Sequence, residues 1–319
     1  MMDPDILGWL LELENPSARY LALTQLLDRP QTDPEAASAR AAILDWGPAR
    51  AILDAQWPEG YWVHPGVGYS PKHRATVWQI IFLAALGAPC TGPVERACGY
   101  VLANSRLGDG RFSAYKTAQG AIACLNGNLL AAMQHLGYHD ARLDESLEAL
   151  ASMVERDGFR CRFNAPSPLP ARMHDGLPCA WGAVKMLGAF GAIPAEERTE
   201  PVRDAIAAGV EFLFGTDLAG GTYPTATTPS PLWHQFGFPL GYTSDLLEIL
   251  LVLGQLGLAR DARLGEAIGV LISKRLPSGK WSLQHTPKST WGTFGRLGTP
   301  SKWITLRALR VLRDWEGTP

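Results

Sequence analysis

Polar residues inside apolar, helix-like stretches are the positions where this chain could carry out chemistry, because burying a polar group without a partner is costly. Asp245 follows Tyr242 by three residues in Leu/Ile-rich sequence, and Lys185 lies six residues after Cys179. One interpretation pairs Asp245 with Lys185 or with Lys302 in a buried ion pair. Another makes Asp245 a general acid or base whose pKa is shifted by burial. Both interpretations stay open.

Histidines and their polar neighbours occur in the loops that lead into the most apolar stretches. Histidine is the side chain that transfers protons near neutral pH. Together with Asp245, we therefore take His174, Asp175 and His234 as candidate catalytic residues. The competing interpretation is that these loop residues are only solvent-exposed polar groups.

Aromatic and polar side chains of the same stretches are candidate ligand contacts. They are Trp78, Asn128, Trp181, Lys185, Trp233, Tyr242, Lys302 and Trp303. Aromatic walls can stabilise cations or stack on apolar and sugar rings. The competing interpretation is that the tryptophans only fill the core.

Zinc is a further option, although the sequence by itself predicts no cofactor. Cys124, Cys179 and His174 could supply three ligands and leave a fourth position for water, as in catalytic zinc sites. Free cysteine is also among the most buried residue types, so both cysteines could be small apolar fillers. The five cysteines include no Cys-x-x-Cys pair, and no disulfide framework is predicted.

These candidates are positioned by a turn that recurs five times, in which a glycine precedes an aromatic or basic residue by one or two positions. The turns are Gly60-Tyr61-Trp62, Gly110-Arg111-Phe112, Gly158-Phe159-Arg160, Gly221-Thr222-Tyr223 and Gly279-Lys280-Trp281. Their glycines are 48 to 63 residues apart. A repeat of this length is typical of stacked two-helix units.

Between the turns, strongly apolar stretches alternate with stretches that carry charge on one face. The apolar ones are 73–86, 118–136, 179–190, 242–256 and 301–312, and the one-sided ones are 92–102, 140–154, 194–214 and 261–274. Helices that are apolar all round are buried, and one-sided helices cover the outside. The pattern predicts an all-α fold, an α/α toroid of about five to six helical hairpins with inner and outer rings. A closed ring is favoured over an open superhelix because the inner stretches are too apolar to face solvent. The loops that lead into the inner stretches should then converge on one mouth of this ring.

Length and charge narrow the function classes. We expect one toroid domain over 1–319, with N-terminal helices in 1–54 and five hairpin repeats in 55–319. The net charge of −2 gives no indication of the basic surface that binds nucleic acid. No uninterrupted apolar run reaches the length of a membrane span, so we expect a soluble, cytoplasmic protein. The oligomeric state does not follow from the sequence.

One turn carries a longer motif. Gln56-Trp57-Pro58-Glu59-Gly60-Tyr61-Trp62 fits the Gln-x-x-x-Gly-x-Trp motif of squalene and oxidosqualene cyclases, in which the glutamine ties helix ends together. Over essentially its whole length the chain resembles the α/α-toroid superfamily of terpenoid cyclases and protein prenyltransferase β-subunits. It is most similar to compact bacterial prenyltransferase/squalene-oxidase-repeat proteins. The short sequence motifs that recur in those proteins are present here as Cys124-Leu125-Asn126-Gly127-Asn128, Cys179-Ala180-Trp181-Gly182, Gly237-Phe238-Pro239 and Pro300-Ser301-Lys302-Trp303.

The catalytic motifs of that superfamily are missing from the sequence: Asp-x-Asp-Asp, Asp-Asp-x-x-Asp, and the standard zinc patterns. The resemblance implies an enzyme, or a relative of one, that binds an apolar isoprenoid-like molecule in a central cavity. A carbohydrate-active toroid enzyme, a lyase or hydrolase, is the first alternative. A non-catalytic binding scaffold is the second. A deep apolar cavity would favour the isoprenoid, an open polar one the carbohydrate, and a filled ring the scaffold.

Overall fold

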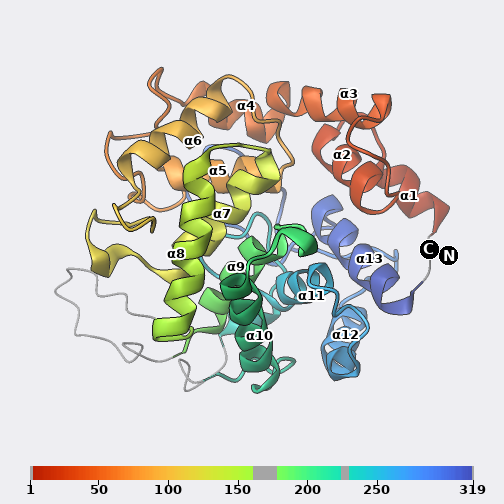
Figure 1. Ribbon diagram of the computed structural model, residues 1–319. Helices are drawn as coiled ribbons and strands as arrows, with labels where there is room; N and C mark the ends of the chain where they lie inside the picture. Colours follow the sequence, from red (N-terminus) through yellow and green to blue (C-terminus); the bar gives the residue numbers. More distant parts are fainter. Residues whose placement is uncertain (1–2, 161–177, 224–229, 318–319) are drawn as a thin grey trace.

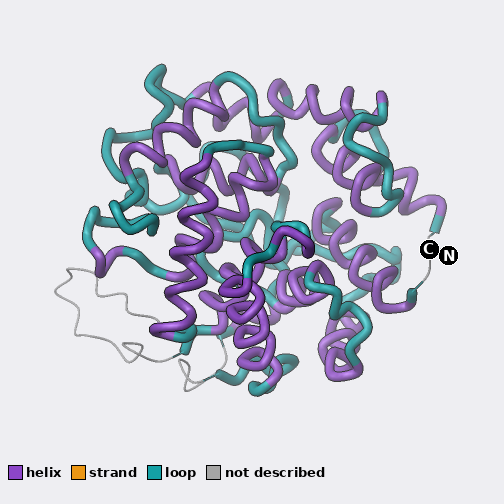
Figure 2. The backbone as a smooth tube through the Cα atoms, viewed as in Figure 1, coloured by secondary structure: helices purple, strands orange, loops and turns teal. Residues whose placement is uncertain are grey.

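The helices of the chain are short and closely spaced, as the repeated turns predict. The computed structural model describes residues 3–160, 178–223 and 230–317 (Figure 1). Within these ranges the chain is helical with connecting loops, and no strand occurs (Figure 2). The helices are α1 (Pro4–Leu10), α2 (Pro16–Gln25), α3 (Pro34–Ala42), α4 (Gly47–Asp54), α5 (Thr76–Ala85), α6 (Pro93–Asn104), α7 (Ala123–Leu136), α8 (Ala141–Asp157), α9 (Ala180–Gly191), α10 (Glu200–Phe214), α11 (Leu246–Gln255), α12 (Gly265–Ser273) and α13 (Lys302–Glu316). None of them has the length and apolarity that a bilayer crossing requires.

The helices form two concentric rings, which confirms the α/α toroid. The inner ring runs through α5, α7, α9, α11, α13 and α2, each beside the next, with α3, α6, α8, α10 and α12 packed outside (Figure 1). The ring closes between its ends, where the Ser17 hydroxyl donates to the Leu86 carbonyl at 2.8 Å. Nearly every residue of α5 is buried, whereas α8 and α10 expose a polar face. The predicted division into inner and outer helices therefore holds.

The recurring turn is fixed by the same hydrogen bond in three of the repeats. The residue two positions after the glycine donates its backbone N–H to a buried side chain at the start of the next inner helix: Trp62 to Thr76, Phe112 to Asn126 and Trp281 to Thr305. These bonds are 2.6 to 3.2 Å long. A buried polar group that is paired in this way costs little and fixes one geometry. The repeat in sequence is thus a repeated joint between outer and inner helices.

Gln56 behaves as the resemblance implies. Its Nε2 donates to the carbonyl of Pro93 at 2.9 Å, which ties the end of α4 to the start of α6. Gly60, four residues on, has φ of +98°, and a Cβ there would lie 2.7 Å from the Arg96 carbonyl oxygen. Only glycine permits both the conformation and the close approach.

The N-terminal ends of the inner helices are filled by aromatic side chains. The Phe238 and Trp303 rings stack with centres 4.4 Å apart and planes at 6°. Phe294 packs edge-on against Phe238 and Phe82, and Trp78 against Tyr242. This aromatic layer closes one end of the ring.

Helices α7 and α9 approach each other more closely than side chains would allow. A Cβ on Gly127 would lie 2.3 Å from the backbone carbonyl carbon of Lys185 and 2.4 Å from the nitrogen of Met186. Gly182, facing back from α9, has Ala123 at 3.2 Å from its own Cβ position. The glycines bring two inner helices into backbone contact and hold Lys185 in place.

Replacing Gly127 by Ala should therefore lower the free energy of unfolding by about 2 kcal/mol, because the overlap involves backbone that cannot rotate away. Gly269→Ala in α12 is the matched control, since nothing lies within 4 Å of its Cβ position. There the helix propensity of alanine should stabilise the protein by up to about 1 kcal/mol. Urea unfolding of both variants measures the difference, and equal effects would contradict the close-contact explanation.

Candidate functional site

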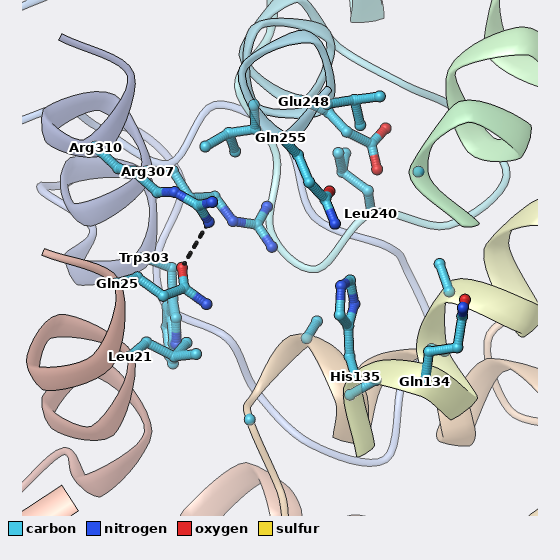
Figure 3. Close-up of a pocket in the computed structure, with 18 of the residues that line it drawn as sticks. Leu21, Gln25, Gln134, His135, Leu240, Glu248, Gln255, Trp303, Arg307 and Arg310 are labelled. Atoms are coloured by element: carbon cyan, nitrogen blue, oxygen red, sulfur yellow. Dashed lines mark hydrogen bonds between the residues drawn. The ribbon is translucent and has the colours of Figure 1, made fainter. Parts of the chain in front are cut away.

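A cavity of about 620 Å³ lies inside the ring, on the side of the C-terminal ends of the inner helices. The inner helices contribute side chains to its wall, among them Ile81 from α5, His135 from α7 and Gln255 from α11. Residues 29–31, which follow α2, complete the rim. Figure 3 shows how the polar side chains converge on this space. The volume lies in the range of small-molecule sites, roughly 300–1,000 Å³.

The cavity is at the opposite end of the ring from the one expected. The sequence placed the mouth at the loops before the inner helices, but the aromatic layer fills that end. Lining residues near the helix C-termini, such as His135 and Gln31, are exposed, whereas Lys185 and Trp303 at the other end of the cavity are buried. Lys185 and Trp303 therefore belong to its floor, and His135 and Gln31 to its mouth.

A buried ion pair forms part of the floor. Lys185 Nζ donates to both carboxylate oxygens of Glu248, at 2.6 and 2.8 Å, and its side chain is only 3% exposed. The pair joins α9 to α11. The expectation that Asp245 would be the partner of Lys185 or Lys302 is wrong, because Asp245 caps α11 and Glu248, three residues later, faces the cavity instead.

Two arginines one turn apart on α13, Arg307 and Arg310, face the cavity from one wall (Figure 3). Arg310 donates to Gln25 at 3.4 Å and lies 3.8 Å from the carboxylate of Asp314. Arg307 has its guanidinium carbon 4.9 Å from the centre of the Phe238 ring, and no described residue accepts a hydrogen bond from it. Burial lowers the pKa of Arg307 from its ordinary value. Its five N–H donors are available to a ligand.

His135, in the last turn of α7, exposes its ring to the cavity (Figure 3). Although the side chain is exposed at the mouth, the surrounding protein partly desolvates the ring and lowers its pKa, and the positive charges of Arg310 and Arg307 lower it further. The imidazole is therefore neutral near neutral pH, and no described residue hydrogen bonds to it. A neutral ring in a polar cavity can accept a proton.

Asp245 lies buried behind the floor and does not line the cavity. Its carboxylate accepts the backbone N–H of Gly237 at 2.7 Å and that of Glu248 at 2.8 Å, which caps α11 and anchors the preceding loop. Burial and the nearby Glu248 raise the pKa of Asp245 to about 7, against the effect of the two N–H groups and Arg307. It positions Glu248 through the backbone.

Of the predicted ligand contacts, Asn128, Lys185 and Trp303 line the cavity. Asn128 Nδ2 donates to the Gly241 carbonyl at 2.8 Å, and Trp303 Nε1 donates to the Ser17 hydroxyl at 3.0 Å. Both side chains are thus held in fixed orientations.

The remaining predicted contacts lie elsewhere. Trp78 and Trp233 are core residues whose indole N–H groups donate to the carbonyls of Tyr69 and Leu218.

Trp181 and Tyr242 pack together on the aromatic side of the ring, with ring centres 6.3 Å apart. Lys302 pairs with Glu12 at 2.6 Å, away from the cavity. Lys302, Trp181 and Tyr242 are therefore not part of the cavity wall.

The predicted catalytic histidine His234 has Nε2 2.7 Å from the carbonyl oxygen of Ala219, outside the cavity lining. His174 and Asp175 lie outside the described residues. Cys124 stands at the start of α7 and Cys179 at the N-terminal cap of α9. The described part of the chain holds no group of three or more potential metal ligands, and a zinc site that includes His174 stays a prediction.

Several cavity residues were not predicted from the sequence: His135, Glu248, Gln255, Arg307 and Arg310. A signal for two of them was present. Gln134-His135 precedes Leu136-Gly137, and Gln255 precedes Leu256-Gly257, so polar residues occupy the last turn of two otherwise apolar helices. Polar residues in the last turn of two inner helices indicate that the C-terminal end of the inner ring is open and not filled by apolar side chains.

No family model and no curated protein matches this chain. Among solved structures, it is similar to an unsaturated glucuronyl hydrolase specific for heparin, with a TM-score of 0.50 and 10% identity over 95% of this chain and 86% of that one. It is also similar to a type II terpene cyclase from Scytonema in complex with geranylgeranyl dihydroxybenzoate, with a TM-score of 0.46 and 14% identity over 98% of this chain and 74% of that one. At this identity the glucuronyl hydrolase supports the α/α-toroid fold alone. Fold and site together define a helical toroid with a central cavity of mixed polar and apolar lining.

Proposed function

We propose that the central cavity binds a small, polar, anionic molecule of the sugar-acid class, and that the chain is a carbohydrate-active toroid enzyme working by acid–base chemistry. The observation that carries this proposal is Arg307. Its guanidinium faces the cavity without a hydrogen-bond acceptor among the described residues, next to Arg310. The Arg307 side chain is partly buried, and a carboxylate in the cavity would pair with its guanidinium in a bidentate manner.

The charged side chains that line the cavity also favour an anionic ligand. Arg29, Lys185, Arg307 and Arg310 are cationic, and Glu248 is the one carboxylate among the described residues that line the cavity. Amide groups of Gln25, Gln134, Gln255 and Asn128 add donors and acceptors suited to hydroxyl groups. A neutral isoprenoid would leave the Arg307 guanidinium without an acceptor among the described residues. The carbohydrate-active alternative fits the wall better than the apolar ligand does. The toroid fold adds nothing to this choice, since one fold carries many chemistries.

A second candidate ligand is an isoprenoid diphosphate. Ile81, Val184, Leu251 and Val252 form an apolar part of the wall that could take a short prenyl chain. The diphosphate would then occupy the arginines. Such a ligand would retain the isoprenoid function suggested by the sequence, with an anionic group added.

Thermal unfolding with a ligand panel separates these candidates. The panel is glucuronate and galacturonate oligosaccharides, neutral galactose oligosaccharides of equal length, farnesyl diphosphate and farnesol. A ligand at roughly 100 times its Kd stabilises the folded state by about 2.7 kcal/mol, which raises Tm by several degrees. We expect this shift with the uronate oligosaccharides and none with the neutral sugars. A shift with farnesyl diphosphate alone would favour the second candidate, and one with farnesol would contradict the anion site.

A further inference from the structure

We propose that the cavity catalyses β-elimination on a sugar acid, with His135 as the base that removes the proton next to the carboxylate and Arg307 as the carboxylate's partner. The inference rests on the proposed function, because it assumes a sugar acid in the cavity. It goes further by assigning the reaction and the residues that perform it.

The first requirement of this reaction is a cation at the carboxylate. Removing a proton from the neighbouring carbon builds negative charge beside a group that is already negative. A guanidinium paired with both carboxylate oxygens offsets that charge as it develops, in a site that is partly closed to water. Arg307 has its donors unused, and Arg310, one turn later, adds a second positive charge on the same wall.

The second requirement is a neutral base next to the cations. His135 faces the same cavity from α7, opposite α13, and its ring is without a described hydrogen-bond partner (Figure 3). Partial desolvation and the positive charges of the two arginines lower its pKa, so the ring is unprotonated near neutral pH. The charged groups of the lining are Arg307 and Arg310 on α13, Glu248 on α11, Lys185 on α9 and Arg29 after α2, and α5 contributes none.

The step is balanced without any further reactant. One imidazole nitrogen of His135 takes the proton from the carbon next to the carboxylate. The electron pair of the broken C–H bond forms a carbon–carbon double bond, and the bond between the next carbon and the glycosidic oxygen breaks. The leaving oxygen takes the proton back from the imidazolium. The products are an unsaturated sugar acid and a free hydroxyl group, and the histidine returns to its neutral form.

Mass spectrometry and proton NMR of galacturonate and glucuronate oligosaccharides incubated with the full-length protein test the inference. Elimination gives products whose summed mass equals that of the substrate and a new vinyl proton signal, whereas hydrolysis adds one water. We expect elimination by the wild type. His135→Gln should keep the wild-type Kd and Tm and reduce kcat by at least about 100-fold. His139→Gln, at an exposed position just after α7, is the matched control and should retain full activity.

The pH profile supplies a readout that a structural role of His135 would not produce. The wild-type rate should fall as the pH drops below the usual histidine range, near 6.5, because protonation removes the base. Binding of the oligosaccharides without any double bond formed, hydrolysis products, or full activity of His135→Gln would each overturn the inference and leave the proposed function intact. Absence of binding to every uronate would instead refute the proposed function itself.

Discussion

Replacing Arg307 by Met is expected to weaken anion binding in the cavity by about 100-fold and at the same time to stabilise the unliganded protein. The methionine keeps the apolar stem that packs near Phe238 but removes a charge that has no hydrogen-bond acceptor among the described residues. Loss of a bidentate, charge-assisted contact should cost about 3 kcal/mol of binding, or roughly two orders of magnitude in Kd. Without ligand, removing this partly buried charge should raise the free energy of unfolding by up to about 1 kcal/mol.

The opposite signs of the two effects make this prediction specific. Calorimetric titration with a uronate oligosaccharide measures the first effect and urea unfolding the second. Arg307→Lys should bind with intermediate affinity, because an ammonium keeps the charge and loses the fork geometry. Arg263→Met is the control: Arg263 is an exposed arginine paired with Asp261 and stacked on Phe214, and its loss should leave Kd unchanged. If Arg307→Met lowers stability and leaves binding intact, Arg307 is a structural residue and the anion site is wrong.

The stability of the protein should fall as pH rises from about 5 to about 8, in a manner that depends on Asp245. The folded-state pKa of this carboxyl, about 7, is above its unfolded value of 3.8. Between these two values the folded state binds more protons than the unfolded state, so the free energy of unfolding decreases with pH. Ionisation of Asp245 lowers the free energy of unfolding by roughly 2–3 kcal/mol between pH 5 and pH 7, and this destabilisation is complete only above pH 7.

Asp245→Asn removes the titration but also weakens the cap. The amide oxygen can accept one of the two N–H groups that the carboxylate holds, and the lost bond should cost about 1–3 kcal/mol at acidic pH. The difference in unfolding free energy between wild type and variant should therefore narrow or reverse as pH rises. Urea unfolding at several pH values measures it. A pH-independent difference would show that Asp245 does not titrate in this range. Loss of activity with unchanged stability would instead restore Asp245 as an acid–base catalyst.

The helical repeat and its joints could be predicted because each depends on residues close together in sequence. Gln56, Gly60 and Trp62 lie in one turn, and the backbone N–H of Trp62 reaches Thr76, at the start of the next inner helix. The tetrapeptide Asp-Ala-Arg-Leu, which occurs at 140–143 and again at 261–264, likewise forms the same local structure at both places. Asp140 and Asp261 both accept the backbone N–H of the arginine two residues later, at 3.0 Å, in outer-ring segments. Such local geometry follows from residue type.

The candidate site was only partly predictable. Lys185, Asn128 and Trp303 were identified because polar or large aromatic side chains stand out in apolar helices. His135 was missed because a polar residue in the last turn of a helix usually faces solvent. Whether such a residue faces solvent or the central cavity depends on how the helices are arranged in the ring.

By itself, the sequence determined the fold: helices alternating in burial, joined by glycine turns that recur at a nearly constant interval, close into a toroid. The tertiary structure alone decided which end of that ring is open. Phe238 and Trp303 come from distant segments and stack only when the ring closes, and they fill the end where the sequence placed the mouth. The partner of Lys185 was likewise decided by the packing of α9 against α11, in which Glu248 reaches its ammonium while Asp245 caps the helix. Contacts between residues far apart in sequence depend on packing geometry, and no local pattern encodes them.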